Sequence, residues 1–179
     1  MEIRALTRAD AEAFQTLRRQ ALEDSPRAFA ESVAEHDAQP LESIAKRLAQ
    51  SPDQFVIGCF HGEHLIGIAG LARHPRTKLR HKALIWGVFV APTFRGQGVA
   101  RAILEEIIRR AKAIDGLMQI NLNVASGTSA SRLYKSLGFE VYGHEPNSIH
   151  VADSFVDEDL MVLRLEQCNF SGIGDALRS

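Results

Sequence analysis

The amino-acid sequence predicts a single α/β domain built on a mixed sheet. Apolar runs of strand length alternate along the chain with segments whose apolar residues recur at helical spacing. One of these strands is followed by a short glycine loop and then by an amphipathic helix. A chain of 179 residues with 45% hydrophobic residues is long and apolar enough to fold around a substantial core.

The N-terminal third is predicted to contain one strand and two helices. Residues 3–6 form a short apolar run, and Thr7 with Asp10 resembles a capping box at the start of a helical stripe. Residues 27–39 show no clear period and are predicted to be loop. Pro40 then opens a second amphipathic helix, since proline is tolerated in a first turn.

The middle of the chain is predicted to supply most of the sheet. Residues 55–60 and 65–71 are apolar runs joined by a connection short enough for a β-hairpin. A third run, residues 84–90, precedes the glycine loop. The helix after that loop is expected to pack through one apolar stripe. This stripe consists of Ile103, Ile107, Ala111 and Ile114.

The C-terminal part is predicted to complete the sheet. Residues 130–137 carry a helical stripe that ends at Gly138, a typical helix stop. The remaining strands are expected over residues 120–124, 139–143 and 160–165. Residues 1–166 are therefore predicted to form one domain. Residues 167–179 are rich in Gly and Ser without periodicity and are predicted to be a loosely ordered tail.

The loop after the third apolar run has the features of a phosphate site. Its sequence is Arg95-Gly96-Gln97-Gly98-Val99-Ala100. Glycine lets backbone N–H groups approach a ligand without a Cβ clash, and a helix start adds unpaired donors. A Walker loop would need Lys and a hydroxyl after Gly98, and a dinucleotide fold would need a small residue at Arg101. The sequence therefore predicts a phosphorylated small molecule of another kind.

Two blocks together resemble a known family. The loop matches R-x-x-G-x-A, and downstream stand Leu122-Asn123-Val124, Leu133-Tyr134 and Gly138-Phe139. With both blocks in this order, the chain resembles the GNAT superfamily of N-acetyltransferases over roughly residues 3–165. The resemblance implies a splayed central sheet flanked by helices. It also implies direct transfer of the acetyl group of acetyl-coenzyme A to a primary amine of a small molecule or protein.

The resemblance also implies which residues hold acetyl-coenzyme A. Residues 95–100 would wrap its pyrophosphate, and Arg95 would either contact a phosphate or cap the loop at the surface. Asn123 would either bind the pantetheine arm or point outward. The thioester carbonyl would be polarised by backbone groups of Val88, Phe89 and Val90. No metal site is predicted.

Tyr134 is the side chain predicted to take part in the chemistry. The resemblance makes it the general acid that protonates the departing thiolate, whereas its spacing alone fits a core tyrosine. Two departures from the family are visible: Gly127-Thr128-Ser129 replaces an expected Asn, and no carboxylate lies within residues 84–90. The general base is therefore open. The candidates are Glu145, Asp157, Glu158, His81 and His144.

Composition limits the expected partners and compartment. The net charge of −1 gives no electrostatic case for nucleic-acid or membrane binding. Residues 73–82 are locally basic and form either a solvated loop or a patch for the phosphates of the acyl donor or an anionic substrate. Cys59 and Cys168 indicate no disulfide framework, which favours a cytoplasmic protein.

Two functions remain in competition. A non-catalytic acyl-coenzyme A binding module would share the phosphate loop, and only the release of coenzyme A in the presence of an amine separates it from an enzyme. The resembled family often forms dimers, so a homodimer is among the expected assemblies.

Overall fold

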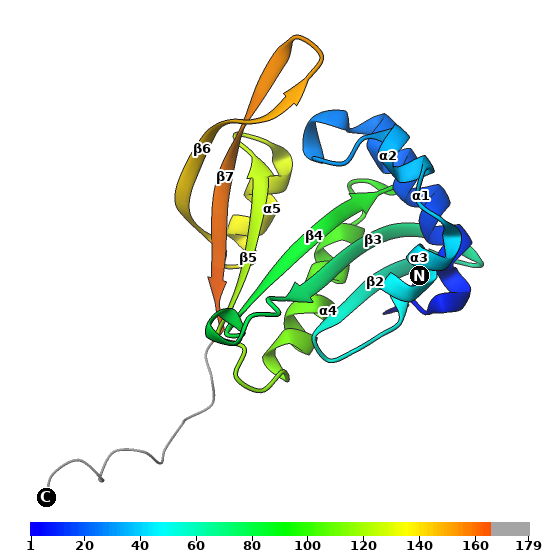
Figure 1. Ribbon diagram of the computed structural model, residues 1–179, viewed down its shortest axis with the longest axis horizontal. Coiled ribbons are helices and arrows are strands. Elements are labelled where there is room, and N and C mark those ends of the chain that lie inside the picture. The colour runs from blue at the N-terminus through cyan, green and yellow to red at the C-terminus, as the bar shows by residue number, and fades with distance from the viewer. Residues whose placement is uncertain (166–179) are drawn as a thin grey trace, which may run out of the picture.

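The computed structural model describes residues 1–165, which form a seven-stranded sheet. Helices flank this sheet (Figure 1). The strand order is β1-β2-β3-β4-β5-β7-β6, and β4 with β5 is the parallel pair among antiparallel ones. The strands are β1 (Glu2–Ala5), β2 (Gln54–His61), β3 (His64–Arg73), β4 (Lys82–Val90), β5 (Gln119–Ala125), β6 (Glu140–Val151) and β7 (Ser154–Arg164). The helices are α1 (Ala11–Asp24), α2 (Val33–Asp37), α3 (Leu41–Leu48), α4 (Val99–Lys112) and α5 (Ser129–Ser136). The predicted mixed α/β architecture is confirmed.

Helices cover both faces of the sheet and enclose two apolar cores. Helices α4 and α5 bury their stripes on one face, which we call the α4 core. Helices α1 and α3 pack on the opposite face, which we call the α1 core. The predicted stripe of α4 is confirmed for Ile103, Ile107 and Ala111, which are fully buried. Its fourth predicted member, Ile114, lies beyond the end of α4 at Lys112 and packs partly buried against the same core. Within residues 1–165, no helix combines the length and apolar character needed to cross a bilayer.

Strand β4 contains a β-bulge. Ile68 pairs with Phe89 and Gly70 pairs with Trp86, so two residues of β4 stand opposite the one residue between them in β3. Gly87 carries the bulge with a φ of 66°, a conformation that favours glycine. The extra residue changes which face of the sheet the side chains after it point to. Phe89 consequently packs in the α1 core.

The sheet splays apart between β4 and β5. The two strands pair only from Lys82 with Gln119 to Leu84 with Asn121. Beyond that point they diverge (Figure 1), and β5 continues its pairing with β7 up to Ala125. The divergence leaves one edge of β4 without a neighbouring strand. The splayed sheet implied by the family resemblance is therefore present.

Two parts of the prediction from sequence are wrong. Residues 27–39 are not all loop, since α2 begins there at a capping box in which Ser32 N–H donates to Glu35 over 2.8 Å. The two closing strands are much longer than predicted and form one hairpin from Glu140 to Arg164. The proposed tail at 167–179, its boundary at residue 166 and Cys168 lie outside the described residues.

Candidate active site

The divergence of β4 and β5 opens a cleft of about 170 Å³ in the middle of the sheet. Residues 85–88 of β4 form one wall and residues 122–125 of β5 form the other. Helix α5 contributes Ala130 and Tyr134, and the segment after α1 contributes Ala28 and Phe29. The cleft therefore lies at a break in the sheet, where one edge of β4 is not hydrogen-bonded to β5.

The glycine loop lies at the start of α4 and lines an adjoining hollow of about 250 Å³. Gly96 and Gly98 have φ values of 75° and 79°, and a Cβ added at either would meet no atom within 4 Å. Arg95 N–H bonds to Pro92 and Ala102 N–H bonds to Gly98. The N–H groups of residues 96–101 have no hydrogen-bond partner among residues 1–165. Such a row of free donors at a helix start can hold an anion.

Three residues of β4, Val88, Phe89 and Val90, were predicted to act through their backbone groups, and their side chains lie in different surroundings. Val88 lines the cleft, and Val90 lines the hollow beside the glycine loop. The side chain of Phe89 is buried in the α1 core. Asn123 is exposed and lines the cleft from the opposite wall. Val88 and Asn123 thus face the same space from β4 and β5.

Arg95 is engaged by the protein itself. Its Nε donates to the Val90 carbonyl over 3.1 Å, and its Nη2 donates to the Asp24 carboxylate at the end of α1. The hydrogen bond from Arg95 lowers the pKa of Asp24. The guanidinium also lies 5.4 Å from the ring centroid of Phe89. In this conformation Arg95 fastens the loop to β4 and α1.

Tyr134 combines burial with access to the cleft. Only 6% of the residue is exposed, and its ring packs edge-on against Phe139 with centroids 5.8 Å apart. Burial raises the pKa of Tyr134 above its ordinary value, so the phenol is protonated at neutral pH. No other residue within 1–165 forms a hydrogen bond with its hydroxyl. The hydroxyl can therefore serve as a proton donor to a group in the cleft.

The segment that replaces the family's Asn forms a helix cap. Thr128 Oγ1 accepts the Ser131 N–H over 3.3 Å and donates to the Ala125 carbonyl over 2.8 Å. It joins the end of β5 to the start of α5, which carries Tyr134. Thr128 also lines the cleft. The cap thus sets how α5 presents Tyr134 to the cleft.

Four of the five base candidates come together on the β6–β7 hairpin. His144 Nδ1 lies 3.2 Å from Asp159 Oδ1, and His144 Nε2 lies 3.6 Å from Asp157 Oδ2. The Asp159 carboxylate also accepts from Ser126, over 2.8 Å, and Ser126 directly follows the cleft wall of β5. The remaining two of the four are Glu145 and Glu158, which pair across the hairpin. His81 is not part of this group, because it precedes β4 at the other end of the sheet.

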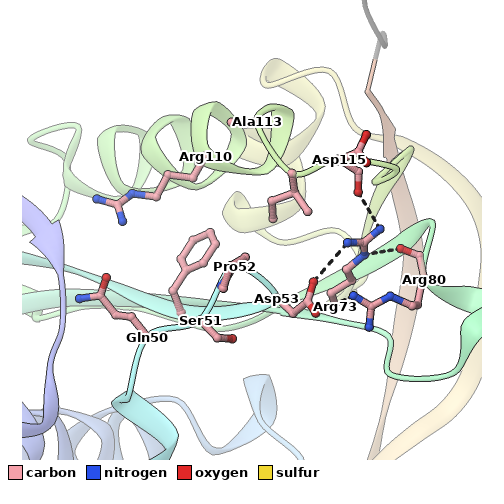
Figure 2. A pocket seen from close by; sticks show the side chains of 11 residues that line it. Gln50, Ser51, Pro52, Asp53, Arg73, Arg80, Arg110, Ala113 and Asp115 are labelled. Atoms are coloured by element: carbon pink, nitrogen blue, oxygen red, sulfur yellow. Dashed lines mark hydrogen bonds and ion pairs between the residues drawn. The ribbon is translucent and has the colours of Figure 1, made fainter. Parts of the chain in front are cut away.

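A cavity of about 790 Å³ lies away from the cleft, beside the basic residues 73–82 (Figure 2). Arg73 donates to Asp53, to the Arg80 carbonyl and to the Asp115 carbonyl, and so ties three segments together (Figure 2). Arg80 donates to the same Asp53 carboxylate over 2.7 Å. The whole of β4, about 26 Å at 3.3 Å per residue, separates this end from the glycine loop. The basic segment is thus not a neighbour of that loop.

Three residues near the cleft were not predicted from sequence. Arg18 donates through Nε and Nη2 to Glu31, at 3.0 and 2.9 Å, and stacks 4.4 Å from the Phe29 centroid. Phe29 and Gly87 line the cleft. Two signals were available: Arg18 lies on the apolar stripe of its helix, four residues after Phe14, and Gly87 interrupts an apolar strand.

Comparison of the sequence and the fold with known proteins finds acetyltransferases. The model of the acetyltransferase (GNAT) family matches residues 13–139. The N-alpha-acetyltransferase RimI of Mycobacterium tuberculosis is 29% identical over 141 residues, which cover 79% of each chain. Among solved structures, a putative acetyltransferase, yncA, from Salmonella typhimurium, determined with acetyl-CoA, is similar with a TM-score of 0.80, 24% identity and 98% coverage of both chains. A ribosomal-protein-alanine N-acetyltransferase from Brucella melitensis has a TM-score of 0.77 and 24% identity, covering 92% of this chain and 100% of that one. This chain therefore belongs to the acetyltransferase (GNAT) family.

Proposed function

We propose that this chain transfers the acetyl group of acetyl-coenzyme A directly to the primary amine of a peptide or small molecule. One observation carries the proposal. The N–H groups of residues 96–101 are free, and Gly96 and residues 98–101 line a hollow beside the cleft. The hydroxyl of Tyr134 is available in the cleft itself. An anion-binding loop and a protonated phenol next to a break in the sheet fit an acyl donor with a pyrophosphate and a thiol leaving group.

Each group of residues in the site has a separate role in the proposed reaction. Acetyl-coenzyme A would supply the acetyl group as an activated thioester. The amides of residues 96–101 would hold its pyrophosphate, and the free edge of β4 around Val88 would orient the thioester. The amine nitrogen would form a bond to the carbonyl carbon while the bond from carbon to sulfur breaks. Tyr134 would donate its proton to the departing sulfur and recover one from solvent, and the amine would lose a proton to solvent.

Two observations bear on the class of acceptor. The name of the mycobacterial relative specifies acetylation of an α-amine, and that relative is similar over most of this chain. The cleft is bordered by Phe29 from the segment after α1, and Arg27 of that segment donates to Ser154 Oγ on the hairpin over 2.7 Å. This contact joins the segment after α1 to the β6–β7 hairpin. We therefore favour a chain-terminal or small amine over an internal lysine in a folded protein.

The test is acetyl transfer by the purified chain. Acetyl-coenzyme A would be mixed with short peptides that begin with different residues and with small amines, and released thiol would be followed alongside product mass. We expect at least one amine to raise thiol release well above the rate without amine and to gain one acetyl group. Binding of acetyl-coenzyme A without release by any amine would favour the binding module. No binding at all would refute the assignment of the loop.

A further inference from the structure

Arg18 has a buried donor that no protein group uses. The residue is only 7% exposed, and its Nε and Nη2 both donate to Glu31. Its Nη1 is buried and has no hydrogen-bond partner within residues 1–165. A buried charged donor without a partner is costly, so a native structure that keeps one is expected to satisfy it in another state.

The unpaired nitrogen faces Gly87 in the bulge of β4. A Cβ built on Gly87 would lie 3.7 Å from Arg18 Nη1, and chain neighbours aside, no other described atom is within 4 Å of that position. Glycine therefore places no side chain between this part of β4 and Arg18 Nη1. A ligand oxygen that came within roughly 2.9 Å of Nη1 beside this glycine would accept a hydrogen bond.

Gly87 and the ring that Arg18 contacts both belong to the lining of the cleft. That ring is Phe29, on which the Arg18 guanidinium stacks. Arg18 belongs to α1, whereas the glycine loop opens α4 on the opposite face of the sheet. An acyl donor held by that loop and a ligand atom beside Arg18 would therefore approach β4 from different faces.

The Arg18 side chain is held in one orientation by its surroundings. Glu31 Oε1 accepts from Gln39 over 2.5 Å, and Gln39 in turn accepts from Arg47 over 2.7 Å. His36 Nε2 lies 3.0 Å from the Gln15 carbonyl on α1. These contacts tie α2 and α3 to α1 around Glu31. The direction of Nη1 is consequently fixed before any ligand arrives, which lowers the cost of recognition.

We propose that Arg18 Nη1 recognises a carbonyl or carboxylate oxygen that the acceptor carries close to its amine, an inference that rests on the proposed function. A peptide N-terminus offers such an oxygen as its first amide carbonyl, and a free amino acid offers it as a carboxylate. An amine without this oxygen leaves Nη1 unsatisfied and is a poorer substrate. Arg18 is thus a specificity residue on the acceptor side.

The experiment compares three acceptors that share one amine environment. They are a peptide that begins with alanine, free alanine, and isopropylamine, which keeps the methyl group and the amine but has a second methyl group in place of the carbonyl or carboxylate group. We expect kcat/KM of the wild type to favour at least one oxygen-bearing acceptor over isopropylamine by about tenfold or more. Preference for the peptide identifies the carbonyl, and preference for alanine identifies the carboxylate.

Two variants test whether Arg18 is responsible for the preference for acceptors that carry the oxygen. Arg18→Met should reduce the ratio between the preferred acceptor and isopropylamine to within about threefold of one, and comparing this ratio between variants cancels differences in amine basicity. Arg19→Met is the matched control, because Arg19 is next on the helix, half-exposed and paired with Asp37 and Glu23. The control should keep the wild-type ratio. Retained binding of acetyl-coenzyme A shows that each variant is folded.

Different results would refute the proposed function and the role of Arg18. No acetylation of any amine by the wild type would refute the proposed function. Acetylation without an oxygen preference, or an undiminished preference in folded Arg18→Met, would refute only the role of Arg18. If Arg18→Met does not fold because Glu31 loses its partner, Arg18→Lys decides. It keeps a cation for Glu31, removes Nη1 and should lose the preference to the same extent.

Discussion

Substituting Gly98 by alanine separates backbone strain from ligand binding. Gly98 has a φ of 79° and Gly62, in the β2–β3 turn, has a φ of 59°. An added Cβ meets no atom within 4 Å at either position. Neither substitution therefore creates a clash, and each carries only the cost of holding alanine in the left-handed region, about 1–2 kcal/mol. Gly62→Ala is thus a matched control for stability.

The two variants should differ in ligand affinity. Gly98 is the N-cap of α4 and lies within the run of unpaired amides at residues 96–101. A methyl group there would point into the hollow beside the loop and hold a phosphate away from the nearest donors. Losing one hydrogen bond to a charged group costs about 1.5–3 kcal/mol, so the affinity for coenzyme A should fall by at least about tenfold.

The measurement pairs calorimetry with urea unfolding. Both variants should lose a similar amount of unfolding free energy, and only Gly98→Ala should bind coenzyme A more weakly. An affinity for coenzyme A that is unchanged from wild type in folded Gly98→Ala would refute the assignment of the loop as the pyrophosphate site. Equal losses of affinity would show that strain alone, and not the position of the methyl group, weakens binding.

Three further predictions concern catalysis, packing and pH. Tyr134→Phe should lower turnover by about 10²–10⁴-fold while stability and acetyl-coenzyme A affinity stay near wild type, and turnover within threefold of wild type would move the proton donor to solvent. Ile107 is fully buried, so Ile107→Ala should cost about 2–5 kcal/mol in urea unfolding, and a loss below about 0.5 kcal/mol would contradict the packing of α4. The hydrogen bond from Arg4 lowers the pKa of Asp10 from 3.8 to about 2. The stability that Asp10 contributes is therefore complete above about pH 5 and is lost as the pH falls through 4 toward 2. Asp10→Asn should flatten this part of the pH profile of unfolding free energy, and an unchanged profile would rule out the contribution.

Helix α4 and its loop could be predicted from sequence because each is specified by residues close together in the chain. The apolar stripe has a helical period, and the structure buries Ile103, Ile107 and Ala111 as that period requires. The left-handed φ of Gly96 and Gly98 is a property of the backbone at those residues. Neither feature depends on which distant segment packs nearby, so a single sequence is sufficient for both.

The segments that were missed depend on partners elsewhere in the chain. Helix α2 has five residues, too few to show a period, and only its Ser32 and Glu35 capping box is visible in the sequence. The hairpin of β6 and β7 is mostly exposed on β6 and has register shifts after Val141 and Glu145. These shifts interrupt the alternation by which a strand is identified. Its extent is set by pairing with the neighbouring strand, which sequence alone does not reveal.

The bulge at Gly87 shows why the acceptor side of the cleft was the hardest part to predict. Simple alternation along β4 would put Ile85 and Phe89 on the same face, yet Ile85 packs in the α4 core and Phe89 in the α1 core. The extra residue exists only relative to β3, so no pattern within β4 reveals it. The sequence does show two residues that are unusual in their places, a glycine inside a strand and an arginine on the apolar stripe of a helix. In the structure these two residues lie next to each other beside the cleft, because Arg18 Nη1 is 3.7 Å from the position of a Cβ on Gly87. Exceptions to the usual residue preferences of strands and helices are expected at functional sites. The proximity of Arg18 and Gly87 therefore supports a role for Arg18 in recognition and not only in packing.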